Sequence, residues 1–278
     1  MRIARVAGAF AFGSADRDGW TSARALDVAT ASDLAALLPQ LSRIAERLPG
    51  SVPDLGANVR LDPPVGRPGK VLAVGLNYLQ HIAEVGKPRP EAPMIFAKYP
   101  SSVTGPAESI VLNPDVTAEV DYEAELAVVI GRPARGVDAA DALHYVLGYC
   151  VANDVSARDL QRSESQISRS KSLDTFCPIG PWITTADDVP DPQALAIRTL
   201  VNGEVRQSST TGDLLFGIAA LIAHLSRTMT LETGDVLLTG TPSGVGSGMT
   251  PPTYLSEGDI VCCEIDGLGR LENQVSAP

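Results

Sequence analysis

The chain lacks the features that mark a disulfide-bonded or a membrane-spanning protein. Its 278 residues include only four cysteines, Cys150, Cys177, Cys262 and Cys263, and none of them forms a CxxC pair. This spacing suits neither a zinc cluster nor a dense disulfide framework. Three of the four lie in apolar, strand-like surroundings, where we expect buried, reduced thiols. No run approaches the ~18 apolar residues of a membrane-spanning helix.

Positive charge is also scarce. Lys and Arg number 22 against 33 Asp and Glu, which gives a formal net charge of −11 and a pI of about 4.7. Such a chain has no overall attraction for a phosphate backbone or an anionic bilayer, which argues against nucleic acid and membrane surfaces as partners. Small anionic substrates stay open, because a bound divalent cation reverses the field locally.

The first ten residues faintly resemble a secretory signal, with two basic residues and a short apolar stretch. Asp16, Arg17 and Asp18 follow almost at once, and the apolar stretch is short and weak for export. We therefore interpret this segment as a first strand and expect a cytoplasmic protein.

The length lies near the upper limit for one hydrophobic core, so we predict one main domain with a small appendage. A proline- and glycine-rich stretch at residues 63–69 marks the boundary. Residues 1–66 are predicted to form a small α+β domain, with a strand, a turn near Asp16–Gly19 and an amphipathic helix from about Ser32 to Leu48. Residues 67–278 form the main domain.

Short apolar runs separated by Gly, Pro, Asn and Asp dominate the main domain. They predict strands at residues 71–74, 120–130, 147–151, 197–201, 236–238 and 260–265. One apolar stripe predicts a helix over residues 213–226, and a weaker pattern predicts a helix over 138–145. Because strands outnumber helices, we expect mixed or antiparallel sheets rather than a βαβ repeat.

A glycine-rich segment at residues 240–248 invites comparison with a nucleotide-binding loop. Position 249 is Met rather than Gly, and Pro251 and Pro252 forbid the helix that should hold the phosphate. Ser243 is not centred between glycines as in a nucleophile elbow. We interpret the segment as a turn-rich loop.

An acidic segment leads into an apolar run over residues 121–130. Side chains alternate in an extended strand, so Asp121, Glu123 and Glu125 are predicted to share one face. Carboxylates beside so apolar a continuation repel each other and resist desolvation. Either that face is solvated, or a cation lies on it.

Asp154 follows another apolar run, residues 146–152, and so lies at a predicted strand end. If the two strands are neighbours, Glu123, Glu125 and Asp154 form an all-oxygen triad. Such ligands suit Mg²⁺, Mn²⁺ or Ca²⁺ rather than zinc, and leave about half of an octahedron for water and a chelating substrate. The alternative is that Asp154 caps a short helix beginning near Ser156.

The chain has three histidines, and His81 stands three residues before Glu84. On one helical turn the two side chains are neighbours, and a carboxylate beside an imidazole orients it and raises its basicity. This arrangement suits a general base that activates water. The alternative is a pair on a helix surface. His144 and His224 lie in helical patterns and are interpreted as structural.

In this order, the segments resemble the fumarylacetoacetate hydrolase family. The resemblance runs from about Val71 to Val275, roughly three quarters of the chain. The matching segments are residues 75–84, 120–126, 153–161, 171–176, 234–235, 240–246, 255–259 and 267–269.

The resemblance implies roles for individual positions. Glu123, Glu125 and Asp154 match the divalent-metal ligands, which implies Mg²⁺ or Mn²⁺ as cofactor, with Ca²⁺ as a further option. His81 and Glu84 match a pair that in several members sits on a mobile lid and activates water.

Four further positions match groups at the metal site or the substrate. Lys171 matches a lysine that reaches the metal site. Arg158 and Gln161 match substrate-contacting positions, and Thr241 matches a threonine that meets a carboxylate or oxo group, which makes the glycine-rich turn an anion-receiving loop.

The chain also departs from its relatives. Many relatives carry an aromatic residue within the segment that corresponds to residues 162–170, which is predicted here to line or cover the pocket. Asn77 stands where some members have an additional acidic group, which suggests a site with three carboxylates.

The implied activity is metal-dependent hydrolysis of a carbon–carbon bond in an acylpyruvate-type 2-oxo acid. The substrate would chelate the metal, His81 would deprotonate water, and Lys171 would help to stabilise the departing pyruvate enolate. The same site chemistry serves an oxaloacetate decarboxylase, or an isomerase or tautomerase of an unsaturated 2-oxo dicarboxylate in aromatic catabolism. A non-catalytic small-anion binding protein is the alternative from a different class.

By the same resemblance, residues 67–278 are expected to form a mainly β, mixed-sheet catalytic domain of β-roll or barrel-like shape. It follows the small N-terminal α+β domain. We also expect a homodimer.

Overall fold

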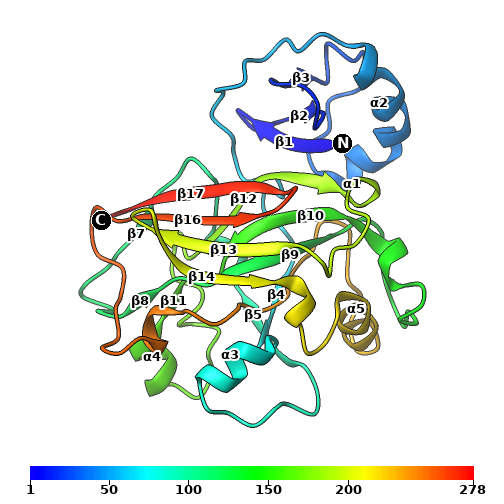
Figure 1. Cartoon of the computed structure of the whole chain (residues 1–278). Helices are drawn as coiled ribbons and strands as arrows, with labels where there is room; N and C mark the ends of the chain where they lie inside the picture. The colour runs from blue at the N-terminus through cyan, green and yellow to red at the C-terminus, as the bar shows by residue number, and fades with distance from the viewer.

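A computed structural model describes residues 1–278 and contains two β-sheets packed against each other, with short helices around them (Figure 1). The ten-stranded sheet runs in the order β3 (Thr21–Ser22), β2 (Ala9–Gly13), β1 (Arg2–Val6), β12 (Cys177–Thr185), β10 (Val146–Asn153), β9 (Ala124–Ile130), β15 (Val236–Leu238), β4 (Val71–Gly75) and β5 (Met94–Lys98), and β6 (Val103–Thr104) pairs with β12. The five-stranded sheet runs in the order β14 (Glu204–Thr210), β13 (Ala196–Val201), β16 (Ile260–Ile265), β17 (Gly269–Ser276) and β7 (Ile110–Val111). A third, two-stranded sheet joins β8 (Val120–Asp121) to β11 (Ser156–Ala157).

The helices are short and lie at the edges of the sheets. They are α1 (Leu34–Leu37), α2 (Leu41–Arg47), α3 (Leu79–Glu84), α4 (Arg158–Ser163) and α5 (Ile218–Ser226). Antiparallel pairs predominate, and β4 with β15, β6 with β12 and β7 with β17 are parallel. The prediction of a mainly β fold with mixed sheets is confirmed, but the large sheet does not close into a barrel. No helix is long and apolar enough to cross a membrane.

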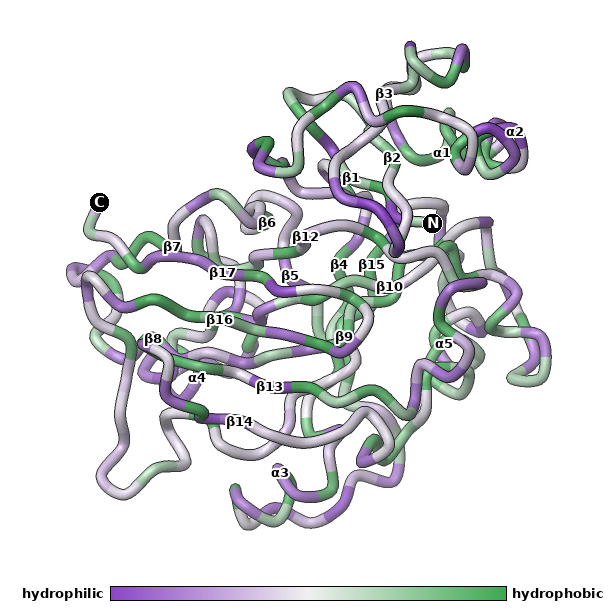
Figure 2. The backbone as a smooth tube through the Cα atoms, turned by 45° about the horizontal axis from the view of Figure 1, so that its top comes forward, coloured by the Kyte–Doolittle hydropathy of each residue, from purple (hydrophilic) through white to green (hydrophobic).

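The central strand β9 is buried on both faces, which explains its nearly unbroken apolar sequence (Figure 2). Leu126 and Val128 join a hydrophobic cluster between the two sheets. Ala127 and Val129 point the other way, into a second cluster. The period of two in the strand therefore divides one run of residues between two cores.

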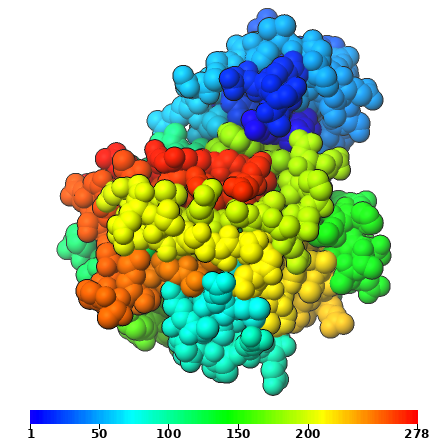
Figure 3. All heavy atoms as spheres, viewed as in Figure 1, coloured from blue at the N-terminus to red at the C-terminus, as the bar shows by residue number.

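The N-terminal part projects from one end of the molecule but continues the large sheet (Figure 3). Ile3 of β1 is opposite Ile183 of β12, and both belong to the second cluster, together with Ile44 of α2. The domain boundary near residue 66 stays a prediction, and the two parts share one sheet and one core.

None of the three predicted helices forms over its full predicted length. Pro39 lies in a 3-10 turn, Leu38–Gln40, that separates α1 from α2, because proline has no N–H for the helical ladder. The helix predicted from residue 213 begins only at Ile218. The N–H groups of Leu215 and Phe216 donate instead to the main-chain and side-chain oxygens of Asn77, at 2.7 and 2.9 Å. The weaker prediction over 138–145 yields only a 3-10 turn, Ala142–Tyr145.

The strand predicted over residues 120–130 is interrupted. Tyr122 and Glu123 separate β8 from β9. The other five predicted strands are confirmed and correspond to β4, β10, β13, β15 and β16. All four cysteines are buried and free, including the three for which this was expected.

The shared core predicts that the N-terminal part does not unfold independently. Ile3→Ala removes a fully buried side chain and should lower the free energy of unfolding by about 2–5 kcal/mol. Urea denaturation followed by circular dichroism and tryptophan fluorescence should show one coincident transition. Val52→Ala, at a side chain 81% exposed, is the control and should change stability by no more than about 0.5 kcal/mol. Two separate transitions in the wild type would contradict the shared core.

Candidate metal centre

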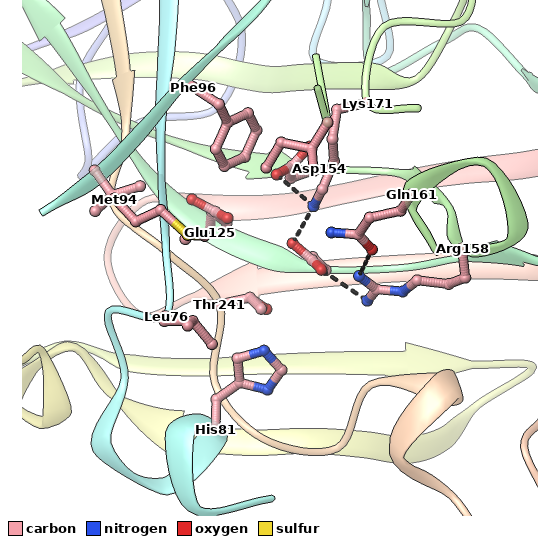
Figure 4. Close-up of a pocket in the computed structure, with 14 residues that line it drawn as sticks. Leu76, His81, Met94, Phe96, Glu125, Asp154, Arg158, Gln161, Lys171 and Thr241 are labelled. Carbon is pink, nitrogen blue, oxygen red and sulfur yellow. Dashed lines mark hydrogen bonds and ion pairs between the residues drawn. The ribbon is translucent and has the colours of Figure 1, made fainter. Parts of the chain in front are cut away.

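The predicted site residues converge on a cavity of about 70 Å³ at one end of the large sheet (Figure 4). Eight of the nine line it: His81, Glu123, Glu125, Asp154, Arg158, Gln161, Lys171 and Thr241. The ninth, Glu84, bonds to His81. Strands β4 and β5 add apolar walls through Val74, Met94 and Phe96, and Leu76 and Ile167 come from loops. Ile167 belongs to the 162–170 segment that was predicted to line the pocket.

Three carboxylates come together because β9 and β10 are antiparallel neighbours. Asn153, the last residue of β10, is opposite Ala124, the first residue of β9. Glu123 and Glu125 flank Ala124, Asp154 follows Asn153, and the N–H of Asp154 donates to the main-chain oxygen of Glu123 at 2.8 Å. One oxygen from each carboxylate lies within 4.8 Å of the other two.

Asp121 does not belong to this group, so the prediction that it shares a face with Glu123 and Glu125 is wrong. The break after β8 turns its side chain away, and its Oδ2 accepts from Arg158 Nε at 2.8 Å. The N–H groups of Gly246 and Ser247 also donate to its carboxylate, at 2.7 and 3.0 Å.

Two buried lysines hold the triad. Lys171 Nζ donates to Glu123 Oε2 at 2.7 Å and to Asp154 Oδ2 at 2.8 Å. Lys98 Nζ donates to the other oxygen of Asp154 at 2.6 Å and to the main-chain oxygen of Lys171. Asp154 is therefore not a helix cap, and α4 begins after Ala157 without a side-chain cap.

Arg158 forms an ion pair with the carboxylate oxygen of Glu123 that Lys171 does not contact. Its Nη2 lies 2.7 Å from Glu123 Oε1, and its Nη1 donates to Gln161 Oε1 at 3.0 Å. Gln161 is thus oriented by Arg158 within helix α4, with both side chains on the cavity (Figure 4).

The two glutamates differ in their electrostatic surroundings. Burial by itself would raise the pKa of Glu123, but the charges of Lys171 and Arg158 outweigh it and lower that pKa to about 2. Burial raises the pKa of Glu125 well above its usual value, and the neighbouring Asp154 and Glu123 carboxylates raise it further. Glu125 has no cationic partner, and its only hydrogen bond comes from the N–H of Gly240 at 2.6 Å.

These contacts fit a divalent cation. The buried cluster contains four carboxylates, counting Asp121, and three cationic side chains, Lys98, Lys171 and Arg158. Glu125 is the one carboxylate of the four without an ion pair, so a bound cation would supply the positive charge that its ionised form lacks. An oxygen-only donor set of this kind matches Mg²⁺ or Mn²⁺. The role of the triad as metal ligands stays a prediction.

His81 and Glu84 lie three residues apart on helix α3, as predicted. His81 Nδ1 is 2.8 Å from Glu84 Oε2, and the N–H of Gly244 donates to Glu84 Oε1 at 2.7 Å. Glu84 therefore favours the imidazole tautomer with the proton on Nδ1, which leaves the Nε2 lone pair for the cavity.

The glycine-rich loop donates to carboxylates of the protein itself. Gly240, Gly244 and Gly246 each present a main-chain N–H to Glu125, Glu84 and Asp121 respectively. Gly244 has φ +100°, and a Cβ there would lie 2.0 Å from the main-chain oxygen of Arg206. These N–H groups are thus used by side-chain carboxylates of the protein, and the expectation that the loop receives an anionic group of the substrate stays a prediction.

Sequence reasoning missed Lys98. Its position is fully buried, yet it ends an ordinary-looking strand, MIFAK, with no neighbouring acidic residue in the sequence. The one available signal is that lysine is almost never fully buried unless it is paired, and burial was not visible from the sequence.

Comparison with known proteins decides the family. The model described as "Fumarylacetoacetate (FAA) hydrolase C-terminal" matches residues 70–276. The chain belongs to the fumarylacetoacetate hydrolase family.

Family members with quite different reactions are similar to this chain. Oxaloacetate tautomerase YisK of Bacillus subtilis is 45% identical over 79% of this chain and 74% of its own length. The structure of fumarylacetoacetate hydrolase from Exiguobacterium antarcticum matches with 40% identity and a TM-score of 0.87, over all of both chains. Maleylpyruvate hydrolase from Sphingobium sp. SYK-6, in complex with manganese(II) and pyruvate, matches with 32% identity and a TM-score of 0.82, over 100% of this chain and 99% of its own.

The charge network predicts a strong effect for Lys98→Met. Loss of this buried cation leaves Asp154 with an unpaired oxygen, which should lower the free energy of unfolding by about 3–5 kcal/mol in urea titrations. The control Lys87→Met, at an exposed position, should stay within about 0.5 kcal/mol of the wild type. Equal stability of the two variants would show that Lys98 is not needed to hold Asp154.

Proposed function

We propose that the protein is a divalent-metal-dependent tautomerase that interconverts the keto and enol forms of oxaloacetate or a closely similar 2-oxo dicarboxylate. The observation that carries the proposal is the triad of buried carboxylates on the same cavity as the paired His81 imidazole. The 45% identity to an oxaloacetate tautomerase supports it.

Glu123, Glu125 and Asp154 would hold the metal. When bound, the cation would withdraw electron density from the 2-oxo oxygen of the substrate and so acidify the adjacent C3–H bonds.

His81 is the proposed proton carrier. Its Nε2 lone pair would take a proton from C3, and Glu84 would stabilise the resulting imidazolium through Nδ1. The imidazolium would then return that proton to the 2-oxo oxygen. The substrate gains and loses no atoms overall, as a keto–enol interconversion requires.

The remaining polar groups suit the carboxylates of the substrate. Lys171 and Arg158 contribute positive charge to the cavity, and both are already tied to Glu123. Gln161 and Thr241 add polar groups at its wall. A cavity of about 70 Å³ equals the liquid volume of roughly two water molecules, which favours a short dicarboxylate over a long acyl chain.

Hydrolysis of an acylpyruvate is the second candidate. The His81–Glu84 pair favours it, because the same imidazole that removes a proton from carbon can remove one from water. The similarity to a maleylpyruvate hydrolase also supports it. The two candidates differ in whether water attacks the substrate, and therefore in whether pyruvate is released.

Two assays in parallel test the proposal. Loss of enol absorbance reports oxaloacetate tautomerisation, and a coupled dehydrogenase reports pyruvate release from acetylpyruvate and oxaloacetate, each with Mg²⁺, Mn²⁺ or EDTA. We expect metal-dependent tautomerisation that EDTA abolishes. Pyruvate from acetylpyruvate without tautomerisation would replace the proposal with the hydrolase, and pyruvate from oxaloacetate alone would indicate a decarboxylase.

Variants assign the roles. His81→Ala should lower kcat about 10²- to 10⁴-fold with Mn²⁺ affinity unchanged, since it removes the proton carrier and no metal ligand. The control His144→Ala, at a side chain 71% exposed, should have wild-type kcat. A His81→Ala enzyme with undiminished kcat would rule out His81 as the proton carrier.

The metal ligands are tested by direct binding. Glu125→Gln removes one charged ligand at nearly constant volume and should weaken Mn²⁺ binding at least about tenfold in calorimetric titrations. Glu257→Gln, at an exposed position, is the control. Unchanged Mn²⁺ affinity in Glu125→Gln would place the cation elsewhere.

A further inference from the structure

Strand β14 at the edge of the small sheet buries only one of its seven side chains, Gln207. The other six are exposed or half-buried, whereas Gln207 has no exposed surface at all. An amide buried in this way needs partners for two lone pairs and two N–H hydrogens.

All four positions of the Gln207 amide are filled. Its Oε1 accepts from the main-chain N–H of Ala124 at 3.0 Å and from Thr199 Oγ1 at 2.6 Å. Its Nε2 donates to Thr241 Oγ1 and to the main-chain oxygen of Pro242, both at 2.8 Å. The orientation of the amide is thereby decided, because a flip would place its NH₂ against the N–H of Ala124 and its oxygen against that of Pro242.

The orientation of the Gln207 amide decides whether the Thr241 hydroxyl acts as a donor or as an acceptor towards the cavity. A hydroxyl has one hydrogen, and the bond from Gln207 uses a lone pair of the Thr241 oxygen rather than that hydrogen. Gln207 is the only hydrogen-bond partner of this hydroxyl within the protein. Thr241 lines the cavity, so its O–H hydrogen is left to donate to whatever oxygen lies there.

We propose that Gln207 is a positioning residue that makes the Thr241 hydroxyl a hydrogen-bond donor to a carboxylate or oxo oxygen of the bound 2-oxo acid. Through the N–H of Ala124 it also ties this donor to the backbone between Glu123 and Glu125. A donor held at a fixed place relative to the metal ligands selects substrates with an anionic oxygen at that point. The inference rests on the proposed function in one respect, that the substrate is a 2-oxo acid.

Packing alone offers a competing explanation. Gln207 would then fill the space between β14, β9 and the glycine-rich loop, and its replacement would affect stability without affecting recognition through Thr241. The two explanations differ in whether substitutions at positions 207 and 241 have independent effects on ligand binding.

A double-mutant cycle separates them. The probe is oxalate, a dianion that resembles the enolate of a 2-oxo acid, titrated calorimetrically into the full-length Mn²⁺-loaded protein. Thr241→Val should weaken oxalate binding about 10- to 100-fold, because it removes a hydrogen bond to a charged group. Gln207→Met should weaken it at least about threefold, because the Thr241 hydroxyl is no longer oriented. The double variant should bind like Thr241→Val alone, since both changes act on one donor.

Two controls accompany the cycle. Thr199→Val removes another bond to the same amide but no group of the cavity, and should leave oxalate affinity unchanged within about threefold. Mn²⁺ affinity should also stay unchanged in all variants. If Gln207→Met does not fold, Gln207→Glu has the same size, and its carboxylate would accept the Thr241 proton and withdraw it from the ligand.

The outcomes are distinct. Losses that multiply in the double variant, or a loss of Mn²⁺ affinity in Gln207→Met that matches its loss of oxalate affinity, would overturn the role assigned to Gln207 while the proposed function stands. A wild-type protein that binds oxalate no better with Mn²⁺ than with EDTA would overturn both.

Discussion

The structure depends on a group of charges that lie almost entirely out of water. Asp154 is held by two lysines, Glu123 by a lysine and an arginine, and all of these side chains are buried. A charge in the interior costs several kcal/mol unless a partner sits at bonding distance. Each charged side chain must therefore lie within bonding distance of its partner. The strands and helices around the cavity hold the charged side chains at these distances.

Strand pairing in the large sheet places the three carboxylates next to one another. Because β9 and β10 are antiparallel neighbours, the start of one and the end of the other lie together, and the three carboxylates follow from that register. The apolar residues of β9 serve two hydrophobic clusters at once, so the strand is held from both faces. A site built on so rigid a strand pair keeps its geometry, whereas α3 and the glycine-rich loop contribute through their mutual contact at Glu84 and Gly244.

One arrangement of groups serves several reactions of the family. A cation that acidifies a 2-oxo acid and an imidazole that carries a proton are sufficient for tautomerisation, and a water molecule placed beside the same imidazole turns the chemistry to hydrolysis. The relatives of this chain include both kinds of enzyme. Under the proposed function, the choice between these reactions would depend on the shape of the cavity and on polar donors at its wall, such as the Thr241 hydroxyl, rather than on the carboxylates.

The sequence by itself determined the mainly β character, the positions of five strands, the glutamate–aspartate combination and the His81–Glu84 spacing, because these depend on local periodicity or on residue type. It did not determine the break at Tyr122, which turns Asp121 away from the face of Glu123 and Glu125, or the late start of α5, which Asn77 causes from far away in the sequence. Lys98 and Gln207 likewise gain their importance only from partners distant in the chain. Burial is a property of the assembled sheets, and only the tertiary structure decided which polar residues would be enclosed and had to be paired.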